Sequence, residues 1–186
     1  MKLTGKKVAI LATHGFEQSE LEVPRDKLKE AGATVHVVSP EKGEIKGWDM
    51  KDWGQPVKVD RLLGDVSVDD YDAIVLPGGQ INPDLLRING DALEFIRAFF
   101  DQKKIVAAVC HAPWLLIETG IIKGRKATSY QSIKTDCINA GAKWEDSKVV
   151  VDEGLITSRN PDDLEAFCAK IIEAIAEGRH NQRSAA

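Results

Sequence analysis

A cysteine followed directly by a histidine is the pair in this sequence best suited to chemistry. Cys110 and His111 come after residues 104–109, the most hydrophobic predicted strand of the chain. A cysteine thiolate is a strong nucleophile, and an imidazole can take up or return a proton near neutral pH. The pair therefore predicts covalent catalysis by Cys110, with a general acid or base beside it.

Small residues stand two positions before and two after the cysteine. A strand-to-helix turn that presents a nucleophile is too tight for larger side chains at those positions, and Ala108 and Ala112 satisfy this requirement. The pattern predicts a strained backbone at Cys110 and a sulfur at the mouth of the sheet. The dipole of a helix starting near Pro113 would lower the pKa of the thiol. The alternative is a buried cysteine that acts as a small hydrophobic residue.

His111 has two candidate roles. Its backbone N–H could stabilise an oxyanion, and its imidazole could act as general base or acid. The alternative is a structural or solvated histidine.

Three further groups follow other predicted strands. Glu17 comes after residues 8–12, where a protonated carboxyl could donate a hydrogen bond to the sulfur. The alternative is an ordinary carboxylate at the start of a helix, which is how we interpret Glu20. Gly78 and Gly79 form a turn whose amides could supply the second half of an oxyanion site.

The elements that must position these groups alternate between strands and helices. The predicted strands are residues 8–12, 34–38, 72–76, 104–109, 149–151 and 155–157, and the predicted helices are residues 18–31, 91–102, 113–118, 132–140 and 161–178, with a frayed tail after residue 179. Alternation of this kind predicts an α/β sandwich with a mostly parallel sheet, whose ligands bind beyond the carboxyl ends of the strands. Residues 41–60 break the pattern and predict a small β excursion or an ordered loop that could shape a site or an interface.

Composition limits the class of protein. The chain has 186 residues, 43% of them hydrophobic, which suits one domain spanning residues 1–186. Its net charge of −4 and scattered basic residues give no nucleic-acid-binding motif. Its three cysteines, an odd number without regular spacing, argue against a disulfide framework and a zinc site, and no nucleotide-binding glycine motif occurs. With no signal peptide and no membrane-length apolar run, we expect a cytoplasmic protein without metal or other cofactor.

Several longer motifs together resemble one known family. They are Phe16-Glu17-x-x-Glu20-Leu21, Tyr71-Asp72-Ala73-Ile74-Val75-Leu76-Pro77-Gly78-Gly79, Ala108-Val109-Cys110-His111-Ala112-Pro113, Gly124-Arg125-Lys126-Ala127-Thr128-Ser129-Tyr130 and Ile138-Asn139-Ala140-Gly141-Ala142. From about residue 6 to residue 175 the sequence resembles the PfpI-type intracellular proteases and general stress proteins, within the class I glutamine-amidotransferase-like superfamily.

The resemblance implies roles for individual residues. It places the nucleophile on Cys110, the histidine on His111, the carboxyl hydrogen-bonded to the sulfur on Glu17, and the oxyanion site on the amides of Gly79 and His111. In the peptidase members, a carboxylate from a neighbouring subunit orients the histidine. The nearest match here is Asp84, in a loop where the archaeal peptidases carry Glu and one residue fewer.

The same resemblance implies a flavodoxin-like three-layer sandwich, a homodimer or larger homo-oligomer, and a role in stress. It leaves three functions open. The first is a glyoxalase- or deglycase-type enzyme acting on small reactive aldehydes or on proteins that they have modified. The second is an intracellular cysteine peptidase. The third is a non-enzymatic protein that senses peroxide through Cys110 or protects other proteins as a chaperone does.

Overall fold

Residues 2–178 are described by the computed structural model, and the tail predicted to fray after residue 179 lies outside them. The strands are β1 (Lys7–Leu11), β2 (Thr34–Ser39), β3 (Glu44–Asp49), β4 (Asp52–Lys58), β5 (Arg61–Leu62), β6 (Ala73–Leu76), β7 (Ile105–Val109), β8 (Lys126–Ala127), β9 (Lys143–Trp144), β10 (Val149–Asp152) and β11 (Leu155–Ser158). The α-helices are α1 (Gln18–Glu30), α2 (Ile81–Leu86), α3 (Gly90–Asp101), α4 (Pro113–Glu118), α5 (Lys134–Asn139) and α6 (Leu164–Glu177). Short 3-10 helices occupy Leu63–Asp65, Val68–Asp70, Gln131–Ile133 and Pro161–Asp163.

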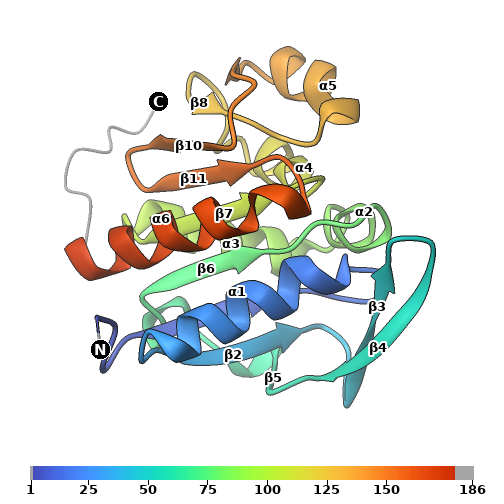
Figure 1. The fold of residues 1–186 in the computed structure, drawn as a ribbon, viewed down its shortest axis with the longest axis vertical. Helices are drawn as coiled ribbons and strands as arrows, with labels where there is room; N and C mark the ends of the chain where they lie inside the picture. The colour runs from blue at the N-terminus through green and yellow to red at the C-terminus, as the bar shows by residue number, and fades with distance from the viewer. Residues whose placement is uncertain (1, 179–186) are drawn as a thin grey trace.

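Within these residues, seven strands form one central sheet in the order β10-β11-β7-β6-β1-β2-β5. Neighbouring strands are parallel throughout, except that β10 runs antiparallel to β11. Helices α1 and α6 cover one face, and α3 lies behind the other (Figure 1). The predicted three-layer α/β sandwich with a mostly parallel sheet is therefore confirmed.

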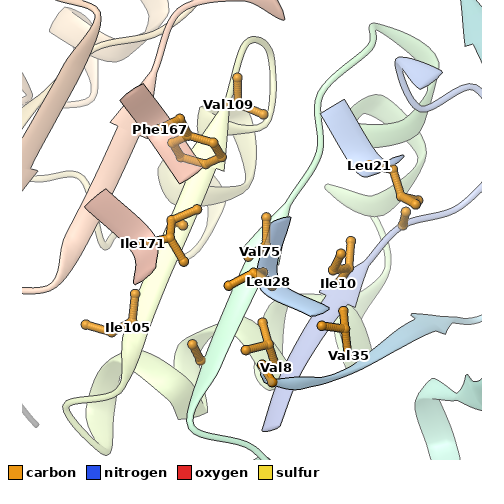
Figure 2. Packing of buried hydrophobic residues seen from close by; sticks show 14 of the residues in the cluster. Val8, Ile10, Leu21, Leu28, Val35, Val75, Ile105, Val109, Phe167 and Ile171 are labelled. Atoms are coloured by element: carbon orange, nitrogen blue, oxygen red, sulfur yellow. The ribbon is translucent and has the colours of Figure 1, made fainter. Parts of the chain in front are cut away.

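The continuous apolar run of β1 has a direct structural cause. Val8 and Ile10 point into the core beneath α1 and α6, whereas Ala9 and Leu11 point into the core on the α3 side. Because successive side chains of a strand face opposite ways, a strand covered on both faces must be apolar at every position. Figure 2 shows the first of these cores, in which Leu28 of α1 packs near Val8 and Val75.

The predicted β excursion at residues 41–60 is an antiparallel hairpin formed by β3 and β4, which stands beside the start of α1 (Figure 1). It closes around Gln18, whose side-chain oxygen accepts the N–H of Gln55 at 2.9 Å. A Cβ added to Gly47 or Gly54 would lie 2.3 Å from that oxygen, which explains the glycines inside these strands. The hairpin is thereby fixed against the segment that carries Glu17 and Glu20.

In the described part of the chain, every helix is too short or too polar to cross a membrane.

Candidate active site

A cavity of about 540 Å³ opens where β1, β6 and β7 end. Its walls are formed by Gly15, Glu17, Glu20, Trp48, Met50, Gly79, Gln80, Ile81, Cys110, His111, Tyr130 and Pro161. Loops that follow parallel strands meet at this edge of a sheet, so residues far apart in sequence line one hollow. The hairpin contributes Trp48 and Met50 to the wall, which gives residues 41–60 a role in shaping the site.

Cys110 occupies the turn between β7 and α4 with a positive φ of 62°. This left-handed conformation is strained for any residue other than glycine, and such strain needs support from the surroundings. The Cys110 N–H donates to the carbonyl oxygen of Ser158 at 3.1 Å, and its own carbonyl oxygen accepts the N–H of Tyr130 at 2.8 Å. Ala108 and Ala112 are fully buried beside the turn. The strained turn predicted from these alanines is confirmed.

His111 is held against the sulfur. Its Nδ1 lies 3.1 Å from the Cys110 Sγ, and its Nε2 lies 3.1 Å from the Ser132 Oγ. The ring stacks on Tyr130, with centroids 4.8 Å apart and planes 24° from parallel, and meets the edge of Trp114 at 5.2 Å. Burial lowers the pKa of His111, which favours a neutral imidazole that can accept a proton.

The carboxyl beside the sulfur belongs to Glu20, and the prediction that Glu17 would lie there is wrong. Glu20 is fully buried, its Oε2 accepts the N–H of Gly78 at 2.8 Å, and its carboxyl interacts with the Cys110 thiol. Glu17 precedes the first residue of α1, and its carboxyl accepts a hydrogen bond from the backbone N–H of Met50, so its side chain lies towards the hairpin at the cavity wall. Three residues later, the helix turns Glu20 inward.

Burial raises the pKa of Glu20 to about 8, although the Gly78 N–H opposes this shift. The pKa of Glu17 is also raised, first by burial, while the backbone N–H of Met50 lowers it and the charge of Asp49 raises it further. At neutral pH, Glu20 is therefore largely a protonated acid that does not repel a negative sulfur.

Backbone N–H groups contact both acidic groups of the site, and that of Gly79 lies near both Glu20 and Cys110. The N–H groups of Gly79 and His111 are directed at the Cys110 sulfur. The N–H of Gly78 is occupied by Glu20, so the prediction that Gly78 offers an oxyanion donor is wrong. Gly79 has a φ of 77°, and a Cβ there would lie 2.4 Å from the carbonyl oxygen of Gly15, so only glycine fits the position.

The direction of the thiol pKa differs from the one predicted. Burial raises the pKa of the Cys110 thiol, and Glu20 raises it further once that carboxyl is ionised, whereas the amides of Gly79 and His111 lower it. Cys110 is only 6% exposed, so the loss of water around its thiol outweighs two hydrogen bonds. The reactive sulfur therefore has to release its proton when it attacks, and His111 Nδ1 is the nearby acceptor.

Exchanging Glu20 for Gln should remove a pH dependence of stability. The folded pKa of about 8 lies above the usual value of 4.5, so between these values the folded chain holds a proton that the unfolded chain has lost. The contribution of Glu20 to the wild-type free energy of unfolding should be fully present below pH 4.5. It should decrease by up to about 1.4 kcal/mol per pH unit as the pH rises to about 8. Urea titrations across this range should show a flatter curve for Glu20→Gln.

Glu17→Gln is the matched control for this measurement. Glu17 is only partly buried, so this variant should keep most of the wild-type decline. Wild-type and Glu20→Gln curves that run parallel across the range would contradict a protonated, buried Glu20.

Asp84 lies apart from this cavity in a single chain. It is exposed in the first turn of α2 and is absent from the described residues that line the cavity. Its action on the histidine of a neighbouring subunit, and the homo-oligomer itself, stay predictions.

The sequence does not single out Ser132 as a site residue, although the motif that ends at Tyr130 lies only two residues before it. Residues 2–178 hold no cluster of three or more His, Cys, Asp or Glu side chains that could bind a metal ion.

Comparison with known proteins gives one consistent result. The model of the DJ-1/PfpI family matches residues 6–174. General stress protein 18 of Bacillus subtilis is 46% identical over 165 residues, which span 88% of this chain and 94% of that protein. Deglycase PfpI of Pyrococcus furiosus is 43% identical over 169 residues, which span 91% of this chain and 99% of that protein. The crystal structure of Drosophila melanogaster DJ-1beta superposes with a TM-score of 0.85 at 30% identity, covering 92% of this chain and 90% of that one.

Proposed function

Because this chain belongs to the DJ-1/PfpI family, we propose that it is a cysteine-dependent enzyme that converts reactive aldehydes, or the adducts that such aldehydes form on proteins. The observation that carries the proposal is the 3.1 Å contact between the Cys110 sulfur and His111 Nδ1, on a strained turn that faces an open cavity. A relative of matching length, 43% identical, is named a deglycase.

The first chemical step follows from the positions of these groups. The Cys110 sulfur forms a bond to the aldehyde carbon, the thiol proton passes to His111 Nδ1, and the electron pair of the carbonyl double bond moves to the oxygen. The amides of Gly79 and His111, which point at the sulfur in the resting site, would donate to that oxygen as negative charge moves onto it. His111 then returns the proton to the oxygen, which leaves a neutral hemithioacetal. Glu20 stays protonated and adds no opposing charge.

Several features favour an aldehyde over a peptide amide. Peptide cleavage requires a lasting imidazolium that can protonate the leaving amine, whereas aldehyde addition has no leaving group. Burial lowers the pKa of His111, and the side chain at its Nε2 is the neutral Ser132 rather than a carboxylate. A cavity of about 540 Å³ also suits a small ligand.

The raised thiol pKa bears on the peroxide-sensing alternative. Oxidation to sulfenic acid follows the amount of exposed thiolate, and the Cys110 thiol is buried with a raised pKa. We therefore expect slow oxygen addition at Cys110 under mild peroxide. Intact-mass spectra that show rapid oxygen addition at Cys110 would instead support the sensor.

Substrate comparison tests the proposal. The purified protein should consume methylglyoxal, without added glutathione and in the presence of a chelator, and should release a hydroxy acid. In parallel it should leave a fluorogenic peptide intact. Peptide cleavage without aldehyde turnover would favour the peptidase, and turnover of neither substrate would contradict both enzymatic functions.

A further inference from the structure

The imidazole of His111 makes a hydrogen-bonding contact at each of its two nitrogens. Nδ1 faces the Cys110 sulfur, and Nε2 lies 3.1 Å from the Ser132 Oγ. We propose that Ser132 is a positioning residue, whose hydroxyl accepts the Nε2–H hydrogen bond and so keeps Nδ1 free to take the thiol proton. This inference rests on the proposed function, because it gives His111 the role of base in that reaction.

The reason lies in the tautomers of the ring. A neutral imidazole carries its proton on one nitrogen only. With the proton on Nδ1, His111 could only donate towards the sulfur and could not accept the thiol proton. An acceptor at Nε2 favours the other tautomer, in which the Nδ1 lone pair faces the sulfur. After the transfer, both nitrogens carry protons, and the Ser132 oxygen still accepts from Nε2–H.

Ser132 is held in place by the same backbone contacts that support the nucleophile. The Tyr130 N–H donates to the Cys110 carbonyl oxygen at 2.8 Å, which ties this segment to the turn. Ser132 follows in the 3-10 helix Gln131–Ile133, whose last residue, Ile133, is only 2% exposed and anchors the helix in the core. The hydroxyl is therefore presented to the imidazole by a fixed segment rather than by a free loop.

This arrangement would supply within one chain the contact that the resemblance to the peptidase members implies for Asp84 of a neighbouring subunit. Asp84 is exposed on α2, whereas the Ser132 hydroxyl already occupies the hydrogen-bonding position at Nε2. A neutral hydroxyl stabilises an imidazolium less than a carboxylate does. Ser132 therefore suits a base that holds the proton briefly during addition to an aldehyde.

The test compares Ser132→Ala with the hydroxyl-retaining Ser132→Thr and with Asp84→Asn. Thr135→Ala is the matched control, since Thr135 is exposed on the adjoining helix α5 and loses a hydroxyl away from the imidazole. Two readouts are measured for each variant after confirming unchanged thermal unfolding. One is the rate of Cys110 alkylation by iodoacetamide as a function of pH, followed by peptide mass mapping, and the other is kcat and KM for methylglyoxal.

Ser132→Ala should slow alkylation near neutral pH and lower kcat, both by about five- to tenfold, because one hydrogen bond that favours the thiolate–imidazolium pair is lost. KM should stay within about twofold, and Ser132→Thr and Thr135→Ala should match the wild type. Alkylation needs no substrate, so it tests Ser132 even if wild-type protein consumes no aldehyde. An alkylation profile of Ser132→Ala that overlays the wild type, an equal loss in Ser132→Thr, or a loss only in Asp84→Asn would overturn the inference.

Discussion

Cys110→Ser is expected to lower kcat/KM for methylglyoxal by at least about a thousandfold. A hydroxyl is a far weaker acid than a thiol, so His111, with the neutral Ser132 rather than a carboxylate at its Nε2, should remove its proton far more slowly. The side chain is nearly isosteric, and the contacts that hold the turn come from the backbone at Ser158 and Tyr130. The fold should therefore survive, and circular dichroism should show an unchanged spectrum.

Cys168→Ser provides the control for that loss. Cys168 is buried in α6 at 2% exposure and does not line the cavity. Its replacement removes a buried thiol without touching the cavity, so activity should stay within about twofold. Equal losses in the two variants would point to general destabilisation, and no loss in Cys110→Ser would remove the cysteine from the mechanism.

Gly78→Ala is expected to lower activity by at least about a hundredfold and the free energy of unfolding by roughly 1–3 kcal/mol. A Cβ at this position would lie 2.5 Å from Glu20 Oε2, 2.6 Å from the Cys110 Cβ and 2.8 Å from the Val109 carbonyl oxygen. These contacts are too short to be relieved by moving one flexible side chain. The buried carboxyl and the nucleophilic turn would both have to shift, which urea unfolding and steady-state kinetics would register together.

Gly64→Ala is the matched glycine replacement. No atom lies within 4 Å of an added Cβ at Gly64, which sits in a 3-10 helix. This variant should keep both activity and stability close to wild type. A Gly78→Ala protein with normal kinetics would contradict the close packing of the carboxyl, the glycine turn and the nucleophile.

The sequence was most informative where local sterics decide the structure. The apolar run at residues 8–12 predicted β1 because a doubly covered strand tolerates no polar residue, and Ala108 and Ala112 predicted the tight turn at Cys110 because nothing larger fits. Both features can be predicted from residues that are close together in the sequence. The interruption at residues 41–60 likewise predicted the hairpin, although its packing around Gln18 is a long-range contact.

Other parts of the site depend on contacts that spacing alone does not define. Glu17 and Glu20 are three residues apart, and the start of α1 decides which of them faces the sulfur. The predicted helix start at residue 18 agrees with the structure, but the side of the helix that faces the sulfur depends on how α1 packs against Gly78, a contact far apart in sequence. The pairing of His111 with Ser132 spans 21 residues and depends on a short 3-10 helix that has no strong sequence signal.

The direction of the Cys110 pKa was missed for a related reason. The helix dipole and the amide donors could be anticipated from the strand-to-helix pattern, and both favour a thiolate. The burial of the sulfur and its closeness to Glu20 could not be anticipated, because both depend on how α1 packs over the sheet. Burial therefore decides the direction, and the site relies on His111 as a proton acceptor.

Stepwise alkylation tests the central claim most directly. Wild-type protein is treated with increasing amounts of iodoacetamide, the modified cysteines are mapped by mass spectrometry, and the remaining methylglyoxal turnover is measured on the same samples. Activity should fall in proportion to the fraction of Cys110 alkylated and reach zero while Cys137 and Cys168, which are buried away from the cavity, stay unmodified. Undiminished turnover by protein whose Cys110 is fully alkylated would show that this cysteine is not the nucleophile.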